Sequence, residues 1–540
     1  MATGLVDGIH GLAELYYAKF GFLMGVTRIL GSFLSVGAVY LLLRLAWGLA
    51  DRLGGWLAAV ALAFAWLDIV CCHYPTADVP SAFMLLASVV WAWRLYQRPA
   101  GRRDYILGGL LAGAAGAIKY PAAAGLVAML AAHFLARRPA PGATTFPRRP
   151  RAAEGAALLL LATALGFLVL CPWAILDWPD FFADMVYQRA YNASGPEPAW
   201  QLGRFFFGMT PPAGLGAPLN ALALLGLAWF AARRPRDALV VLSGPTLALL
   251  AYASTNRFMP RWYETVVPFV ALGVGMGACA VSHVLGRAVR SARAGAWLAS
   301  VVVAGSLAPP VAQAARYDWI LLQPDTRRTA SGWIEQHVPA GAHVVLTQWR
   351  WASPDVPQDK YRTTWLVVGS PERLYAGLRL KALLDGPVGH WLRKLAPRGL
   401  ARLRQRQEAF LRAGQRLEDL LPPLPKDAEW AVVNLRELSM AAANACGAFE
   451  PVPGVRYEAF GPLVLEWSQT LLSTLHERAE QRWVFTGSEA EEHPWGVEPY
   501  GSPTLVIFRL APTGSRDSPK ELGQRRRRHN MPSHAPTSLR

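Results

Sequence analysis

The chain has few cysteines, few charges and little acid for its length. Only 5 of its 540 residues are cysteine and 17% are charged, with 37 acidic residues against 54 basic ones. No C-x-x-C pair occurs, which excludes a disulfide framework or a cysteine zinc knuckle. No G-x-G-x-x-G, Walker loop, H-E-x-x-H or G-x-S-x-G stands in the context that it needs, which argues against a nucleotide-driven transporter and against a hydrolase.

Apolar residues are abundant, and they are concentrated in one part of the chain. They make up 53% of the sequence, too much for one water-soluble core. From Thr27 to Gln313 they form stretches, several of which reach the roughly 20 residues that cross a bilayer. We therefore predict a mainly α polytopic membrane protein with about ten transmembrane helices, at residues 27–50, 55–72, 80–96, 105–118, 121–136, 155–176, 213–232, 238–254, 263–285 and 295–312.

The loops between these stretches alternate in charge. Arginines gather in the loops after residues 50, 96, 136, 232 and 285, whereas the alternate loops hold few basic residues, among them Lys119, Arg189, Arg257 and Arg261. By the positive-inside rule the arginine-rich loops are cytoplasmic, so the other set faces the outside of the cytoplasmic membrane. This topology accounts for most of the net charge of +17, and we expect membrane lipids rather than nucleic acid as the partner.

The same rule places the N-terminus outside, without a signal or anchor ahead of the first span. We expect that at least one helix precedes Met1; the alternative is a genuine N-out protein. The predicted parts are an outer loop remnant at 1–26, a transmembrane domain at 27–313, an extracytoplasmic α/β domain at 314–515 and a disordered basic tail at 516–540. Strand-like runs in the α/β part begin near residues 342, 364, 430, 482 and 504.

Two ionisable residues lie at the outer ends of apolar segments. Asp78 stands in H-Y-P-T-A-D-V-P, and Lys119 stands in G-A-I-K-Y between two short segments, where it should lie below the outer surface and need an anion. Alternatively, Asp78 is a helix N-cap before Pro80, and Lys119 snorkels to the headgroups. His73 could join Asp78 around a metal ion, or it is only a hydrogen-bonding neighbour.

The order of these motifs resembles a known enzyme family. R-I-L-G-S-F-L from Arg28, H-Y-P-T-A-D-V-P, G-A-I-K-Y, N-R-F-M-P-R-W-Y-E-T and P-D-T-R-R-T-A-S-G-W-I-E-Q-H-V are similar to GT-C glycosyltransferases. The bacterial branch allied to protein O-mannosyltransferases and lipid A aminoarabinose transferases is the most similar. The resemblance covers residues 10 to 345 and implies inverting transfer of a sugar from a polyprenyl-phosphate donor to a lipid, glycan or protein acceptor.

The resemblance also implies roles for individual residues. Asp78 matches the second acidic position of the family, and Lys119, Arg257 and Arg261 match positions that hold the carrier phosphate. Expected neighbours of this site are His73, Tyr120 and Tyr263. The family's first acidic motif has no counterpart before Arg28, and we expect it upstream of Met1. The metal requirement is left open, because one carboxylate is thin support for a divalent cation.

Two alternatives remain open at this point. The first is a lipid-linked saccharide transporter or flippase, in which Lys119 is a counter-ion of the substrate; the sequence has no internal repeat of the kind such proteins often carry. The second is a catalytically inactive GT-C relative, because the principal acidic motif is missing. The sugar and the acceptor are not specified by these residues.

Overall fold

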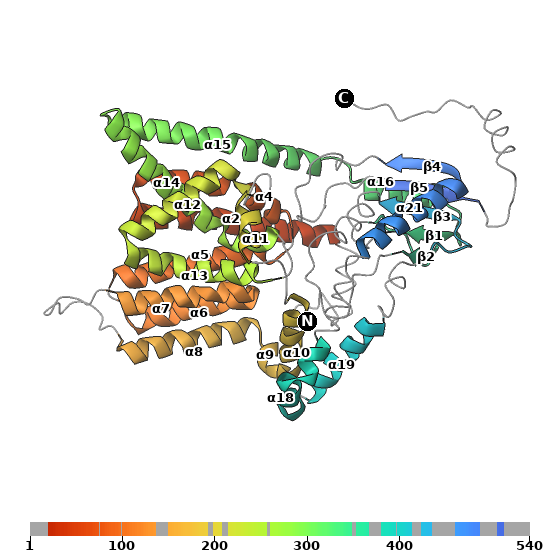
Figure 1. The fold of residues 1–540 in the computed structure, drawn as a ribbon, viewed down its shortest axis with the longest axis horizontal. Helices are drawn as coiled ribbons and strands as arrows, with labels where there is room; N and C mark the ends of the chain where they lie inside the picture. The colour runs from red at the N-terminus through yellow and green to blue at the C-terminus, as the bar shows by residue number, and fades with distance from the viewer. Residues whose placement is uncertain are drawn as a thin grey trace.

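The structure is a computed structural model of the whole chain. It describes residues 20–74, 76–98, 100–136, 150–192, 198–207, 214–255, 260–347, 353–366, 380–395, 397–412, 423–434, 460–485 and 505–511. Arg257, the residues before 20 and the predicted tail at 516–540 lie outside these ranges. The described chain forms a bundle of apolar helices, a group of surface helices and a sheet covered by helices (Figure 1).

Helices fill the apolar part of the chain. They are α2 (Phe20–Leu49), α3 (Arg52–Ala63), α4 (Trp66–Cys72), α5 (Asp78–Gln97), α6 (Arg102–Ile118), η1 (Tyr120–Ala124), α7 (Gly125–Leu135), α8 (Ala152–Leu170), α12 (Ala217–Arg233), α13 (Pro235–Ala253), η3 (Pro260–Val266), α14 (Val267–Ala288) and α15 (Ala292–Leu321). They run side by side, and α15 leads from the far end of the bundle toward the sheet (Figure 1).

Six described helices are long and apolar enough to cross a membrane, and a seventh span results if α3 and α4, which meet at a bend of 49°, are counted as one. The count of ten transmembrane helices therefore stays a prediction. Two boundaries differ from the sequence analysis. Helix α2 begins at Phe20, and α15 continues through the predicted division between residues 313 and 314. Pro309 and Pro310 lie inside α15 without ending it.

Glycines allow the central helices to approach closely. A Cβ atom on Gly226 of α12 would lie 2.2 Å from the carbonyl oxygen of Gly273 and 2.3 Å from the amide nitrogen of Gly277, both in α14. Gly113 of α6 meets the backbone of Thr163 in α8 in the same way, at 2.1 Å. Small residues at such crossings let backbones pack closely where the hydrophobic effect no longer drives association. The bundle core is buried around these contacts.

Helices that follow α8 connect the bundle to the C-terminal part of the chain. After α8 the chain forms α9 (Trp173–Leu176), α10 (Trp178–Asn192) and α11 (Pro198–Phe207). Helix α10 packs on α18 (Pro387–Leu395) and α19 (Pro397–Arg412) through an apolar cluster. Asp184 of α10 pairs with Arg406 of α19, and these helices lie together in Figure 1.

The C-terminal part of the chain contains a five-stranded mixed sheet. Its strands are β1 (His343–Leu346), β2 (Arg362–Trp365), β3 (Trp430–Asn434), β4 (Ala479–Phe485) and β5 (Leu505–Leu510), in the order β2-β1-β3-β5-β4. β1 runs parallel to β2 and β3, whereas β5 runs antiparallel to β3 and β4. Alternate side chains enter two cores, one shared with α16 (Thr326–His337) and the other with α21 (Phe460–Arg478). Each strand falls on or next to a strand-like run of the sequence.

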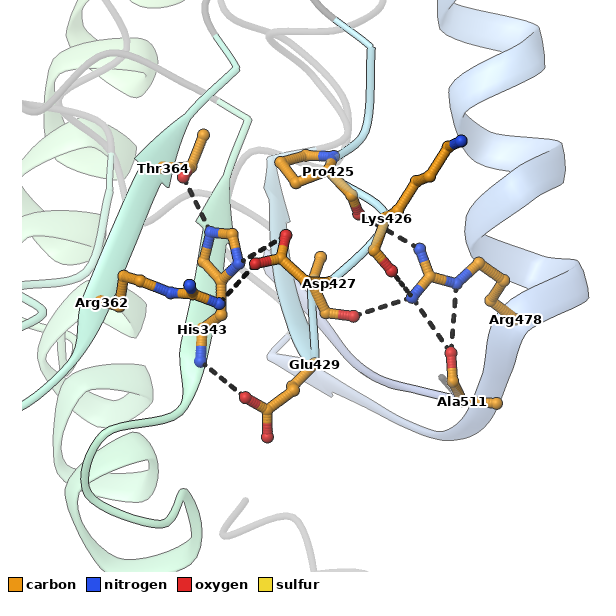
Figure 2. A network of polar contacts seen from close by, with 10 residues as sticks. His343, Arg362, Thr364, Pro425, Lys426, Asp427, Glu429, Arg478 and Ala511 are labelled. Atoms are coloured by element: carbon orange, nitrogen blue, oxygen red, sulfur yellow. Dashed lines mark hydrogen bonds and ion pairs between the residues drawn. The ribbon is translucent and has the colours of Figure 1, made fainter. Parts of the chain in front are cut away.

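A polar network ties the starts of the three parallel strands together (Figure 2). The buried His343 ring lies 2.8 Å from the Thr364 hydroxyl through Nε2 and 3.3 Å from an Asp427 oxygen through Nδ1. Arg362 donates to the other Asp427 oxygen at 2.6 Å. Desolvation acts to raise the pKa of Asp427, but a backbone hydrogen bond and the charges of His343 and Arg362 outweigh it and lower that pKa.

Candidate functional site

Asp78 and Lys119 meet where α5 begins and α6 ends. Asp78 is the first residue of α5 and Lys119 is the C-cap of α6, and the ammonium donates to a carboxylate oxygen of Asp78. The side chains are 4% and 19% exposed, respectively. The N-cap alternative for Asp78 was wrong, because Ala77 occupies the cap and no side chain caps the helix. Lys119 is the more exposed partner of the pair.

The Lys119 ammonium also lies over an aromatic ring of α13. It lies 5.1 Å from the centre of the Tyr252 ring, an arrangement that stabilises a cation by about 0.5–2 kcal/mol. The Tyr252 hydroxyl lies 3.1 Å from that of Thr265, which in turn lies 2.6 Å from that of Ser81. Ser81 of α5, Tyr252 of α13 and Thr265 of η3 thus form a buried network of hydroxyl groups next to the ion pair.

Two further buried acids lie near this hydroxyl network, and neither was singled out from the sequence. Asp68 of α4 and Glu264 of η3 are 4% and 0% exposed. Their carboxyl groups lie within hydrogen-bonding reach of each other, and the Ser35 hydroxyl donates to Asp68. Each is an isolated acid in an apolar run, W-L-D-I-V and W-Y-E-T-V. That isolation was a usable signal, because an acid inside a membrane segment is costly and rare.

The three predicted neighbours lie in different places. His73 turns away from Asp78: its Nδ1 lies 2.8 Å from the Ile69 carbonyl and its Nε2 lies 3.5 Å from an Asp318 oxygen. Tyr120 is half exposed and packs on Phe167 and Phe181. Tyr263 is fully buried and packs beside the Tyr252 ring, with 5.9 Å between ring centres.

The structure describes one of the two predicted arginines. Arg261 lies in η3, partly buried and three residues before Glu264. Arg257 lies outside the described residues, so its role as a phosphate ligand stays a prediction.

The arrangement does not fit a divalent metal ion. Among the residues that the structure describes, no group of three or more histidine, cysteine, aspartate or glutamate side chains could hold one. His73 is engaged with Ile69 and Asp318, and Asp78 is paired with Lys119. A lysine ammonium in contact with a carboxylate takes the place that a cation would occupy.

An apolar cavity lies between α6, η1 and α8. It has a volume of about 340 Å³ and is lined by Gly113, Gly116, Ala123, Leu160, Thr163, Ala164, Phe167 and Leu168. Gly116 is three residues before Lys119, less than one helical turn away. Phe167 of the lining also contacts Tyr120, which follows Lys119 in the chain. The cavity therefore opens near the end of α6 at which Lys119 stands, although its lining does not include Lys119 or Asp78.

Comparisons with family models and with curated proteins find no match to the chain. Solved structures do match. The archaeal oligosaccharyltransferase AglB from Archaeoglobus fulgidus, in complex with an inhibitory peptide and a dolichol-phosphate, is 12% identical, with 78% of this chain and 60% of that chain covered and a TM-score of 0.40. ArnT from Cupriavidus metallidurans, bound to undecaprenyl phosphate, is 13% identical, with coverages of 89% and 83% and a TM-score of 0.42.

The arabinofuranosyltransferase AftD from Mycobacteria is 14% identical, with 91% of this chain and 36% of that chain covered and a TM-score of 0.31. The chain spans only 57% to 63% of the length of the archaeal oligosaccharyltransferases that it matches.

Proposed function

We propose that the chain is a membrane glycosyltransferase that moves a sugar from a polyprenyl-phosphate donor to a hydroxyl group of a lipid, glycan or protein acceptor, with inversion, on the outer side of the cytoplasmic membrane. The observation that carries this proposal is the Asp78–Lys119 pair at the end of α6 near which an apolar cavity opens. A polyprenyl phosphate has the two matching features, an anionic head and an apolar chain.

The chemistry follows from the two side chains. The acceptor oxygen forms a bond to the anomeric carbon while the bond from that carbon to the phosphate oxygen breaks. The acceptor proton passes to a carboxylate, and the phosphate leaves with the bonding electrons. Lys119 stabilises the negative charge that grows on the phosphate, and it does so more strongly in a largely buried site than in water. Asp78 is the carboxylate that lies beside this lysine.

The apolar cavity is the proposed seat of the first isoprene units. Ala164 lines it and is exposed in the described chain, so a larger side chain there fills the recess at little cost to packing. Leu165 is also exposed but does not line the cavity, which makes it a matched control position.

The test uses the full chain in membranes with a panel of undecaprenyl-phosphate sugars. Ala164→Phe should weaken binding of undecaprenyl phosphate, whereas Leu165→Phe should not. Asp78→Asn should abolish sugar transfer while leaving carrier binding, and Lys119→Ala should weaken carrier binding. Wild-type activity of Asp78→Asn would contradict the proposed role. Movement of intact donor across vesicles without release of free carrier would favour the transporter instead.

A further inference from the structure

Two buried carboxyl groups in the membrane part remain outside the proposed chemistry. Asp68 lies in α4, in the bent pair of helices, and Glu264 lies in the span that runs from Pro260 to Ala288. Their exposures are 4% and 0%. An ionised carboxylate in such surroundings is costly unless a partner or a proton neutralises it. The protein therefore has to satisfy both groups internally.

The hydrogen-bond donors around the pair are unequal. Asp68 accepts a hydrogen bond from the Ser35 hydroxyl. Neither carboxyl oxygen of Glu264 has a hydrogen-bond donor within the described part of the chain, although the Asp68 carboxyl lies within reach. Two carboxylates offer only acceptors to each other, so a hydrogen bond between them needs a proton on one. Because Asp68 already has a donor, that proton belongs on Glu264.

We propose that Asp68 and Glu264 form a proton-binding site in the membrane interior, in which Glu264 holds the proton and donates it to the Asp68 carboxylate. The charged and titratable groups that act on the pair are Asp78, Lys119, Cys71 and Cys72. Lys119 is the cation of this group, and Asp78 already neutralises it. Two like charges in contact in a buried site are disfavoured, and one proton removes the repulsion.

The proton shared by Glu264 and Asp68 also affects the pair between Asp78 and Lys119. If Asp68 and Glu264 were both ionised, they would compete with Asp78 for the Lys119 ammonium. The ammonium would then be drawn toward Asp68 and Glu264. With Glu264 neutral, Lys119 stays with Asp78, at the side from which an anion arrives. This consequence rests on the proposed function, whereas the proton-binding site does not.

The first test uses the full chain in lipid nanodiscs and dicyclohexylcarbodiimide, an apolar reagent that modifies protonated carboxyl groups. We expect modification of the peptide containing Glu264 at neutral pH and loss of that modification at alkaline pH. Asp68→Asn should reduce it, because the asparagine amide can donate to an ionised Glu264 and so remove the need for a proton. Asp318, whose side chain is 55% exposed, is the internal control and should remain unmodified.

The second test is infrared difference spectroscopy of Glu264→Gln against the wild type. The glutamine amide can also donate to Asp68, so this variant should fold, and it should lose the carbonyl band of one protonated carboxylic acid. A band lost without carbodiimide labelling still supports the site. Absence of both signals would overturn the proposal, as would protection of Glu264 by sodium or magnesium ions, which would indicate a bound cation. Either result leaves the carrier-binding assay on Lys119→Ala unaffected, so the two proposals fail separately.

Discussion

Removing Lys119 should destabilise the membrane part far more than removing an exposed ion pair. Lys119→Met leaves the Asp78 carboxylate, whose side chain is 4% exposed, without its cation. Loss of one partner from a buried pair costs about 3–5 kcal/mol, because the remaining charge stays buried. The Tyr252 ring also loses the cation above it, which adds to the cost. Replacing both partners, as in Asp78→Leu with Lys119→Met, should restore most of the stability.

Two buried cysteines next to the site provide the assay. Cys71 and Cys72 are 1% and 9% exposed, so a thiol reagent modifies them only when the structure opens locally. A cost of about 3–5 kcal/mol corresponds to modification that is roughly a hundred to several thousand times faster, measured peptide by peptide with mass spectrometry.

The matched control is Arg102→Ala, which breaks the pair between Arg102 and Glu154 at the other end of the bundle. The side chains of Arg102 and Glu154 are 75% and 33% exposed, so we expect little change in the rate at which Cys71 and Cys72 are modified. An increase of less than about tenfold for Lys119→Met would refute the reasoning, because it would mean that water or another group compensates Asp78. An equal effect of both variants would show that burial does not decide the outcome.

Three further predictions concern other parts of the chain. Gly226→Ala should destabilise the bundle by about 1–3 kcal/mol through overpacking against α14, whereas Gly305→Ala, with nothing within 4 Å of the new Cβ, should be neutral or slightly stabilising in the same thermal unfolding assay. Because the folded-state pKa of Asp427 lies below its ordinary value of 3.8, its stabilisation is present above that pH and is lost as the pH falls through the folded value; Asp427→Asn should remove this dependence in an acid titration followed by near-ultraviolet circular dichroism. Arg406→Glu should speed proteolysis at α10, and Asp184→Arg in the same chain should reverse the effect.

Hydropathy located apolar helices of the described chain, since it is a local signal, whereas the count of ten spans and the orientation drawn from loop charge stay predictions. An apolar run of sufficient length forms a helix whatever it packs against, and the five strand-like runs each fall on or beside a strand of one sheet for the same reason. Partners were harder to predict. The sequence placed Asp78 and Lys119 at the same side of the membrane, but it could not show that the two bond to each other across 41 positions.

The same limit explains the two missed acids. Asp68 and Glu264 were absorbed into apolar segments because hydropathy averages over a window, and their proximity depends on how α4 meets η3. His73 was grouped with Asp78 on sequence distance, but α15 extends to Leu321 and brings Asp318 within 3.5 Å of the imidazole. Residues close in sequence at a helix end can thus face different neighbours.

Helix α10 contacts both parts of the protein through adjacent residues. Phe181 packs on Tyr120, next to Lys119, with 6.3 Å between ring centres, whereas Phe182 packs on Trp391 of α18 at 4.9 Å. One short helix therefore connects α18 with Tyr120, the neighbour of Lys119 in the chain. If a ligand of the C-terminal part shifts α18 and so changes the anion affinity of Lys119, thermodynamic reciprocity requires the anion to change that ligand's affinity by the same factor. Binding of the donor at Lys119 and binding of a ligand at the C-terminal part would then each change the affinity of the other.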